Sequence, residues 1–405
     1  MAIDNKDKKV LKSSIEREQN EVACSAECEK IKGSKNLNVP PLRFPEFTEE
    51  WKAEQLDNIA TLSKGIGISK EQLSEDGEPC ILYGELYTKY KSEIIKQVES
   101  KTDIDGSKLK RSKANDVIIP CSGETAVDIA TARCVPFDSI LLGGDLNVIS
   151  LHKYDGAFMS YQLNGKRKYD IARVAQGVSV VHLYGEHLKT IKTYNPTLPE
   201  QQKIAILLSL LDERIATQNK IIDKLQSLIK GIAQNIVSNN KPNIRLSDCL
   251  DCSSSTLQES DVCETGIYPV YGANGIVGYL DNYNTEGEAV YIIKDGSGVG
   301  IVSYATGKCS ATGTLNTLQA KDGYSLQYLY YILKVFNFEP YKTGMAIPHI
   351  YFKDYGKAKI FCPSYTEQLR YALLQSAIDS KLSVEKNILT SLSSQKQYLL
   401  RQMFI

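Results

Sequence analysis

The longest regular pattern of apolar positions in the chain lies between Pro199 and Val237. Its apolar residues recur at alternating spacings of three and four, and the series is broken only by Gln218. The series is Leu208, Leu211, Ile215, Ile222, Leu225, Ile229, Ile232 and Ile236. This spacing predicts a long helix with a coiled-coil seam along one side. Because an isolated seam would expose its apolar side chains to water, the helix requires a partner helix.

The partner is predicted in the same chain, because the pattern occurs twice. A shift of 167 residues aligns the two copies without a gap, pairing Glu200, Gln201, Ala205, Leu207, Ser209, Asp212, Leu225 and Ser227 with Glu367, Gln368, Ala372, Leu374, Ser376, Asp379, Leu392 and Ser394. The same shift pairs Gly177, His182, Tyr184 and Pro196 with Gly344, His349, Tyr351 and Pro363. The repeat therefore includes the end of a globular module. Its length exceeds the roughly 20 to 50 residues of a stacked solenoid unit, so it indicates a duplicated module with its helix.

The chain is accordingly divided into five segments. We expect a polar segment at 1–40, either disordered or a solvated helix, a first module at 41–198 and a first long helix at 199–240. A second module at 241–365 and a second long helix at 366–405 follow. Both modules mix β-rich runs, such as CILYGELY and DVIIPC, with one apolar helix, near residues 156–163 and in SLQYLYYILKVF. The predicted fold class is α/β, with two similar globular domains joined by two long antiparallel coiled-coil helices in pseudo-twofold symmetry.

Composition narrows the functional classes. Lys and Arg balance Asp and Glu at 48 each, so the chain is not a simple polycation, although a local patch or a partner subunit can supply positive potential. The ten cysteines have irregular spacings and no apolar signal segment precedes them, which predicts reduced thiols in the cytoplasm. Because no apolar run approaches membrane-spanning length, we expect no membrane contact.

Familiar catalytic and cofactor motifs are absent from the sequence. The loop GSGVG at 296–300 lacks the third glycine of a dinucleotide site and leads into a β-rich run. The pairs Cys249/Cys252 and Cys24/Cys28 lack further ligands at zinc spacing. His182 and His349 are equivalent in the repeat, and we interpret both as fixing the backbone where each module meets its helix. We therefore expect no catalytic residue, no metal and no cofactor.

Several motifs together resemble one known family. They are LRFPEF ahead of the first module, LPEQQKIAILLSLLDERIATQNK with its echo YTEQLRYALLQSAIDSKLSVEKN, and the lead-ins GVSVVHLY and GMAIPHIY. Over residues 41–405 the chain resembles the specificity subunit of type I restriction-modification systems. The resemblance implies that each module is a target recognition domain reading one half of a bipartite target in double-stranded DNA. It also implies that the helices are the family's conserved spacers, which dock two adenine N6 methyltransferase subunits and, through them, the restriction (motor and endonuclease) subunits.

The residues themselves agree with a reader that performs no catalysis. Different loops on two copies of one frame suit two different half-sites, and the Asp/Asn-Pro-Pro-Phe/Tyr run of adenine methyltransferases does not occur. Two other classes stay open on sequence alone: an autonomous enzyme acting on DNA, and a coiled-coil scaffold whose modules bind protein. Activity without partners would favour the first, and failure to shift duplex DNA would favour the second.

Candidate DNA-binding residues are polar or charged side chains on loops, many beside glycine, which allows close approach to a groove. In the first module they are Lys64, Ser69, Lys70, Glu85, Tyr87, Lys89, Lys91, Lys110, Arg111, Ser122, Glu124, Thr125, Lys166 and Arg167. In the second module they are Tyr271, Asn274, Lys294, Ser297, Ser310, Thr312, Thr314 and Lys342.

The two long helices carry a further prediction. The repeat shift maps Gln218 onto Glu385, and each lies near the middle of its helix. In an antiparallel pair the middles meet, so we expect these polar groups to lie together at the centre of the helix pair and to fix its register. A helix of about 39 residues is roughly 58 Å long, so the pair is also expected to set the distance between half-sites.

Overall fold

The computed structural model describes residues 37–177, 179–344 and 346–405. Most of the predicted polar segment at 1–40, with Cys24 and Cys28, therefore lies outside the described residues. The chain divides into two compact units: the first holds the residues up to Leu210 together with Lys396–Ile405, and the second holds Leu211–Gln395. Among the described residues, no helix combines the length and the apolar character needed to cross a membrane.

The first unit combines mainly antiparallel sheets with short helices. Its strands are β1 (Lys52–Gln55), β2 (Ala60–Lys64), β3 (Leu73–Ser74), β4 (Glu78–Ile81), β5 (Lys101–Thr102), β6 (Lys110–Arg111), β7 (Asp116–Pro120), β8 (Ser122–Gly123), β9 (Arg133–Val135), β10 (Leu141–Leu142), β11 (Leu146–Leu151), β12 (Val181–His182) and β13 (Lys192–Asn195). Its helices are α2 (Leu56–Ile59), η1 (Lys70–Gln72), α3 (Glu85–Thr88), η2 (Gly106–Lys108), α4 (Ala126–Ile129), α5 (Gly156–Asn164), α6 (Lys168–Val174) and α7 (Gly185–Lys189).

The second unit has fewer elements. Its strands are β14 (Ile244–Arg245), β15 (Leu250–Ser254), β16 (Tyr268–Gly272), β17 (Gly275–Leu280), β18 (Ala289–Ile293), β19 (Val302–Ala305), β20 (Ser310–Ala311), β21 (Leu315–Ala320) and β22 (Lys359–Ile360). Its shorter helices are α9 (Leu246–Cys249), η3 (Glu259–Asp261), α10 (Leu326–Leu333), η4 (Glu339–Tyr341) and α11 (Phe352–Tyr355). The long helices are α8 (Leu198–Ser238) and α12 (Tyr365–Gln402).

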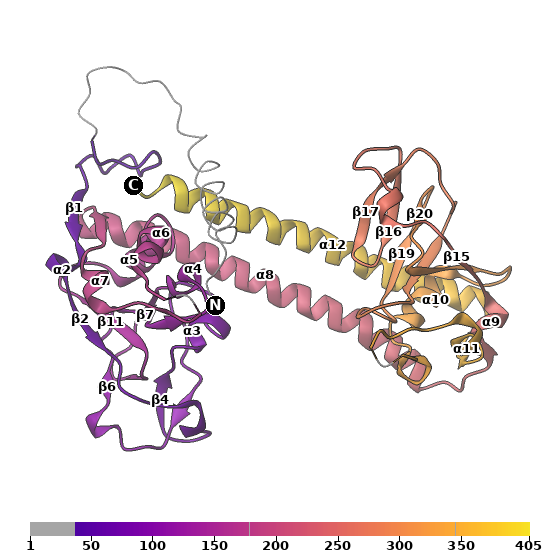
Figure 1. Cartoon of the computed structure of the whole chain (residues 1–405), viewed down its shortest axis with the longest axis horizontal. Helices are drawn as coiled ribbons and strands as arrows, with labels where there is room; N and C mark the ends of the chain where they lie inside the picture. Colours follow the sequence, from indigo (N-terminus) through magenta and orange to yellow (C-terminus); the bar gives the residue numbers. More distant parts are fainter. Residues whose placement is uncertain (1–36, 178, 345) are drawn as a thin grey trace, which may run out of the picture. The chain divides into compact units, whose positions relative to one another are not determined.

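The two units share one frame, as the repeat predicts (Figure 1). The first has a four-stranded antiparallel sheet in the order β2-β11-β7-β9, and the second has its counterpart in the order β15-β21-β18-β19. A two-stranded ladder of β1 with β13 is matched by β14 with β22. Even the parallel pair of β4 with β10 recurs as β16 with β20. The α/β class is therefore correct, and it is built twice.

Alternation along the central strand explains how each unit is layered. In β7, Val117 and Ile119 pack with Met159 of α5. Ile118, between them, packs on the other side with Ile81 of β4 and Leu142 of β10. Successive side chains of a strand point to opposite faces, so β7 is covered on both sides and every residue of it is buried. The same division occurs along β18, whose even-numbered residues pack against α10.

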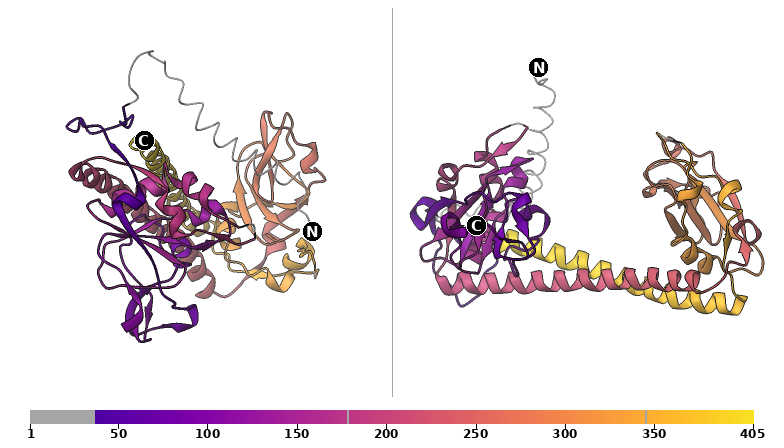
Figure 2. Two further views of the ribbon diagram at one scale, coloured as in Figure 1. Left: turned by 60° about the vertical axis from the view of Figure 1, so that its left-hand side comes forward. Right: turned by 90° about the horizontal axis from the view of Figure 1, so that it is seen from below.

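The long helices carry the seam that the sequence predicts. In the second unit, α8 and α12 lie side by side (Figures 1 and 2), and they run antiparallel because Gln218 contacts Glu385 while Gln375 contacts Ile229. Ile222, Ile229 and Leu382 form the buried cluster between them with Tyr331. The Gln218 amide donates to the Glu385 carbonyl oxygen at 3.0 Å and to the Glu385 carboxylate. The two polar residues expected to meet therefore do so.

One predicted strand is wrong in its second half. The run CILYGELY was expected to be β-rich throughout, but only its beginning belongs to β4, and Glu85–Thr88 forms helix α3. The Glu85 carboxylate accepts a hydrogen bond from the Leu82 amide at 2.9 Å and so stabilises a turn at this point. The hydrogen bond from this acidic side chain to the backbone therefore outweighs the β propensity of the run CILYGELY.

A repeated glutamine links the start of each long helix to the globular part of the unit in which that helix begins. Gln201 donates to the carbonyl of Pro196 at 2.8 Å and accepts from the amide of Asp155 at 2.9 Å. Its repeat partner Gln368 makes the corresponding bonds, to Pro363 at 2.9 Å and from Ser325 at 2.9 Å. Because Asp155 and Ser325 cap α5 and α10, each glutamine joins the long helix to the apolar helix of its unit.

The segment LRFPEF has a similar fastening role in the first unit. Arg43 donates to the buried carboxylate of Glu200 from Nε at 2.6 Å and from Nη2 at 2.7 Å. The Trp51 indole adds a third hydrogen bond at 3.2 Å. Hydrogen bonding to the Glu200 carboxylate raises the pKa of the Arg43 guanidinium. Glu367, the repeat partner of Glu200, instead accepts from Ser364 at the start of α12.

Candidate functional site

In each unit the central strand ends against the repeated lead-in to the long helix. After β7, the short strand β8 pairs with β12, so Ser122 lies opposite His182. After β18, Asp295 lies opposite His349 in the same way. The next residues also correspond, because Leu183 donates its amide to Cys121 at 2.8 Å and Ile350 to Lys294 at 2.9 Å. We call these two places the strand-end sites.

The residues at the two ends of the lead-in loop make the same main-chain hydrogen bonds in each strand-end site. His182 and Gln176 exchange two backbone hydrogen bonds of 2.6 and 2.8 Å, and their repeat partners His349 and Thr343 exchange bonds of 2.7 and 2.9 Å. Each loop requires a glycine near its start. Gly177 and Gly344 have φ of 121° and 90°, and a Cβ there would lie 2.1 or 2.3 Å from the carbonyl oxygen three residues ahead. Main-chain hydrogen bonds and these glycines therefore hold each loop, and the role predicted for the two histidine side chains stays a prediction.

The first strand-end site gathers several predicted residues around a cavity of about 720 Å³. Tyr87, Ser122 and Glu124 line it together with Val180 of the loop. The Tyr87 hydroxyl donates to the Ser122 carbonyl at 3.0 Å, and the Ser122 hydroxyl lies 3.4 Å from His182 Nδ1. Burial raises the pKa of Tyr87, so its hydroxyl stays protonated and remains a hydrogen-bond donor.

Other predicted residues of the first unit are exposed or half-buried and lie outside this cavity. Lys64 is exposed at the end of β2, and its ammonium nitrogen lies 5.6 Å from the centre of the Tyr184 ring. Ser69 and Lys70 are exposed at the start of η1. Lys91 is exposed, with Nζ 3.3 Å from the Tyr87 carbonyl oxygen. Lys110 lines a separate cavity of about 330 Å³.

Several predicted residues also make contacts within the protein itself. Glu85 is buried, and its carboxylate binds the Lys89 ammonium at 2.7 Å. Arg111 is held by two bonds of 2.6 and 2.9 Å to the Glu78 carboxylate, which raise the pKa of Arg111. Thr125 caps α4 by accepting from the Asp128 amide. These groups already have charged or backbone partners within the protein, and their contact with DNA stays a prediction.

Lys166 and Arg167 also belong elsewhere in the first unit. Arg167 donates to the carbonyl of Ile405 at 2.8 Å and pairs with Asp170 at 3.1 Å. Burial, with the charges of Arg167 and Arg401 nearby, lowers the pKa of Lys166. Arg167 of the basic run NGKRK is therefore bound to Ile405 within the first unit. Sequence alone could not separate this role from nucleic-acid binding, because both use exposed-looking basic loops.

The second strand-end site brings Lys294, Thr312 and Thr314 together. The Lys294 amide donates to the Thr314 carbonyl at 3.0 Å, and the hydroxyls of the two threonines are 2.8 Å apart. His349 Nδ1 lies 2.6 Å from the Asp295 carboxylate. Ser297 is exposed on the same turn as Asp295, whereas Thr312 is buried.

The remaining candidates of the second unit differ in exposure. Asn274 is exposed at the turn between β16 and β17. Tyr271 packs against Tyr291, with ring centres 5.3 Å apart. Ser310 is buried and accepts from the Asn284 backbone amide at 3.0 Å. Lys342 pairs with Glu339 at 2.6 Å.

Sequence reasoning missed the exposed side chains of the repeated loops. Val180 and Ile347 are 53% and 59% exposed, and Tyr184 and Tyr351 are 44% and 48% exposed. All four were visible as repeat-equivalent positions, but apolar and aromatic residues in GVSVVHLY and GMAIPHIY suggest a buried strand. The signal that distinguishes them is the alternation with the buried Leu183 and Ile350.

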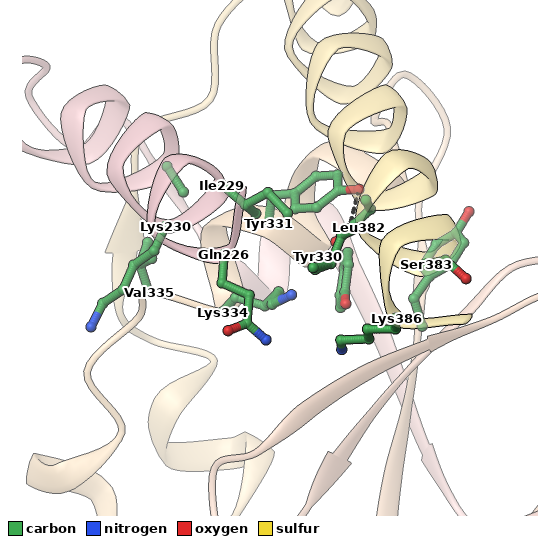
Figure 3. Close-up of a pocket in the computed structure, with 13 residues that line it drawn as sticks. Gln226, Ile229, Lys230, Tyr330, Tyr331, Lys334, Val335, Leu382, Ser383 and Lys386 are labelled. Atoms are coloured by element: carbon green, nitrogen blue, oxygen red, sulfur yellow. Dashed lines mark hydrogen bonds between the residues drawn. The ribbon is translucent and has the colours of Figure 1, made fainter. Parts of the chain in front are cut away.

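Another cavity, of about 770 Å³, lies in the second unit where α8, α10 and α12 meet. Figure 3 shows the side chains that line it, among them Lys334, Lys386 and Gln226, and the Tyr331 hydroxyl donates to the Asp379 carboxylate at 2.7 Å. The Lys334 ammonium lies 5.1 Å from the Tyr330 ring centre. Its lining residues include no predicted DNA ligand, so the cavity is separate from the strand-end sites.

The thiols and the metal-ligating side chains show no redox or metal centre in the described part of the chain. Burial raises the pKa of Cys249 to about 12 and that of Cys252 to about 11. Both thiols are unpaired, and a raised pKa disfavours the reactive thiolate. Within residues 37–177, 179–344 and 346–405, no group of three or more His, Cys, Asp or Glu side chains is placed to hold a metal ion.

Comparison with known proteins gives a consistent result. The family described as "Type I restriction modification DNA specificity domain" matches residues 48–227 and 242–394. The EcoprrI type I restriction enzyme specificity subunit of Escherichia coli is 28% identical over 117 residues, which is 29% of each chain. A putative type I restriction enzyme specificity subunit of Haemophilus influenzae is 34% identical over 89 residues, or 21% of this chain and 23% of the relative. The matches thus span less than a third of either relative.

Solved structures share the fold over nearly the whole chain. The S subunit of a type I restriction-modification system from M. genitalium superposes with a TM-score of 0.66 at 20% identity, covering 91% of this chain and 99% of the other. A chain from a structure concerned with assembly and conformational transition of the type I R-M system gives a TM-score of 0.51 at 15% identity, covering 90% and 99%.

Proposed function

This chain belongs to the family of type I restriction modification DNA specificity domains, and on that premise we propose that it selects the DNA sequence on which a type I restriction-modification complex acts. The observation that carries the proposal is the duplicated strand-end site. Both units present it on the same frame, with Ser122 and Glu124 in one and Lys294 and Ser297 in the other. One frame with two sets of polar groups suits two different half-sites.

We propose that the target recognition domains span 41–198 and 241–365, and that the spacer helices span 199–240 and 366–405. The segment at 1–40 precedes them. Each domain reads one half of a bipartite target in double-stranded DNA. The chain performs no catalysis itself, and methylation and cleavage belong to its partners. These partners are two adenine N6 methyltransferase subunits docked on the helices and the restriction subunits bound through them, and the complex works in the cytoplasm.

Base recognition is assigned to the polar side chains that the fold leaves available. In the first unit these are Ser69, Lys70, Tyr87, Lys91, Ser122 and Glu124, and in the second Asn274, Lys294, Ser297 and Thr314. Asn274 has the side chain best suited to a bidentate contact with adenine, and its position at an exposed hairpin turn favours entry into a groove. Glu85, which is buried and pairs with Lys89, and Arg111, which pairs with Glu78, are not among them.

Exchange of one domain tests the proposal. Residues 242–365 are replaced by a second domain of the same frame, and the chain is expressed with its methyltransferase partner in a host lacking other adenine methylation. Sequencing of methylated sites should show a bipartite motif with one half changed and the other unchanged, because each unit reads independently.

The control is the unaltered chain in the same host. A motif changed in both halves would show that the units do not read independently. Methylation that is unchanged when the chain is absent would show that it does not select the sequence at all.

A further inference from the structure

Resting on the proposed function, we infer that a repeated row of exposed side chains in each unit holds the sugar-phosphate backbone of DNA in the same way at both half-sites, whatever the base sequence. The first row is Val180, His182 and Tyr184, and the second row is Ile347, His349 and Tyr351. These are the apolar–His–Tyr rows. They are distinct from the polar side chains assigned to base recognition.

Each row is one face of an extended segment. Its apolar residue and its tyrosine are exposed in both units, whereas the histidine is exposed in the first unit and half-buried beside Asp295 in the second. Between its members, Val181 and Leu183 are buried in the first unit, and Ile350 is buried in the second. Side chains two residues apart in an extended chain point to the same side, so the row residues share one side. In the first unit His182 and Tyr184 stack, with ring centres 6.2 Å apart. The apolar residue and the tyrosine are exposed at equivalent positions in both units, which makes each row a candidate contact surface.

The rows are also fixed in place before any ligand binds. The loop hydrogen bonds and the glycines at positive φ described above set the backbone at one end of each row. At the other end, the amides of Leu183 and Ile350 are bound to the end of the central strand. A rigid contact surface loses little conformational entropy on binding.

A lysine lies beside the tyrosine of each row, although it comes from a different part of each unit. Lys64 of β2 lies 5.6 Å from the centre of the Tyr184 ring, and Lys353 of α11 lies 5.2 Å from the centre of the Tyr351 ring. The repeat shift pairs Lys353 with Glu186 rather than with Lys64. Both units therefore have a positive charge beside the tyrosine, although the two lysines do not occupy equivalent positions in the repeat.

The backbone of DNA is the ligand that fits these observations. The two units carry different polar groups for different half-sites, so an exposed feature that both retain should serve something common to both. Sugar and phosphate are common to every DNA sequence. In each row the Tyr hydroxyl, the Lys ammonium and the histidine ring can donate to phosphate oxygens. The histidine Nδ1 lies near Ser122 in one unit and Asp295 in the other, which leaves Nε2 for an external acceptor. Val180 and Ile347 supply the apolar contact for a sugar.

The test uses the full chain assembled with its methyltransferase partner. Two double variants are compared, Lys64→Ala with Lys353→Ala, and Tyr184→Ala with Tyr351→Ala. Binding is measured by fluorescence anisotropy on the cognate duplex and on duplexes with one half-site altered, at several salt concentrations. Lys52→Ala, an exposed lysine on β1, is the matched control.

Each double variant should weaken binding to all duplexes by a similar factor, roughly tenfold or more, and leave the methylation motif unchanged. The lysine variant should also reduce the slope of log affinity against log salt by about two, since two phosphate contacts are lost. The control should change neither. A row variant that alters one half of the motif would overturn the inference, because the row would then read bases.

Loss of methyltransferase assembly without any change in DNA affinity would also overturn it, and would mark the rows as protein-docking surfaces. The proposed function is judged separately, from the unaltered complex. If that complex showed no preference between the cognate and altered duplexes, both the proposed function and the inference would be wrong. If it is selective and the row variants bind like the control, only the inference fails.

Discussion

At the scale of single residues, Gln218 and Glu385 occupy seam positions where the apolar pattern would place leucine or isoleucine. Both are buried in the second unit, and Glu385 also pairs with Lys381 at 2.6 Å. Their hydrogen bonds link one level of α8 to one level of α12. A polar pair at a seam favours one register, because any shift would leave buried polar groups without partners.

Replacing both residues by leucine should raise the midpoint of thermal unfolding, since a continuous apolar seam replaces a polar contact. Gln218→Leu alone should instead lower it, because Glu385 then loses its donor on α8. Circular dichroism melts of the two variants and the unaltered chain measure the effect. A large drop in the double variant would show that the polar pair stabilises the helices rather than only fixing their register.

The same pair predicts a pH dependence. Hydrogen bonds from Lys381 and Gln218 lower the pKa of Glu385 below its usual 4.5. A carboxylate whose pKa is depressed in the folded state contributes stability above its unfolded pKa and loses it as the pH falls through the folded value. Acid should therefore destabilise the unaltered chain more than the double leucine variant below about pH 4.5. Equal pH profiles would contradict this assignment.

Loss of the Arg43 side chain should cost more stability than loss of a partner in the Gln218–Glu385 pair, because the carboxylate that Arg43 binds is fully buried. Arg43→Ala would leave Glu200 with only the Trp51 indole as a charge-stabilising donor in the hydrogen bonds described here. Removing one partner of a buried ion pair typically costs about 3 to 5 kcal/mol. Urea unfolding should show a loss of this order. Lys203→Ala, which removes an exposed pair with Glu46, is the control and should have little effect. A small loss for Arg43→Ala would show that the site admits water.

At the scale of elements, the positions that recur in the repeat include residues that link one helix to another, as well as residues of the seam. Gln201 and Gln368 are both buried, and each joins the proline before a long helix to the cap of a short one. The sequence pairs Gln201 with Gln368 but does not reveal this function, because the cap lies 46 residues from Gln201 and 43 from Gln368.

Gln201→Ala and Gln368→Ala should each destabilise the unit that contains the residue. Each would leave a proline carbonyl and a cap amide without this partner, at about 1 to 3 kcal/mol for the one that is buried and less for the one that is partly buried. Hydrogen exchange should show the loss of protection at the start of α8 or α12 and in α5 or α10 respectively. Gln202→Ala, which alters an exposed neighbour, is the control. Loss of protection spread evenly over both units would contradict a local joint.

At the scale of the whole molecule, the lengths of α8 and α12 matter for the proposed function. They contain 41 and 38 residues, slightly more and slightly fewer than the pattern suggests. If the helix pair sets the distance between the half-sites, its length should appear in the number of base pairs between them. This is a property of the chain that no single residue determines.

Adding one heptad to both helices, beside Gln218 and Glu385, should lengthen the unread gap of the motif. A heptad adds about 10 Å at 1.5 Å per residue, which corresponds to about three base pairs. The half-sites themselves should not change, although the added twist of DNA, roughly 100°, should weaken binding. Sequencing of methylated sites decides the matter. An unchanged gap would mean that the helices recruit partners without setting the spacing.

The sequence by itself determined the duplication, the seam and the order of modules and helices, because these follow from periodicity and from an offset that acts along the chain. It also placed Gln218 opposite Glu385, since an antiparallel pair leaves little choice of partner. Only the tertiary structure decided which polar side chains remain available to DNA. Glu85, Arg111 and Arg167 look like loop ligands in the sequence, but each is bound by a group distant in the chain or hidden by packing. Exposure of Val180 and Tyr184 was equally undecidable, because the side of an extended segment that meets solvent depends on which neighbours cover the other side.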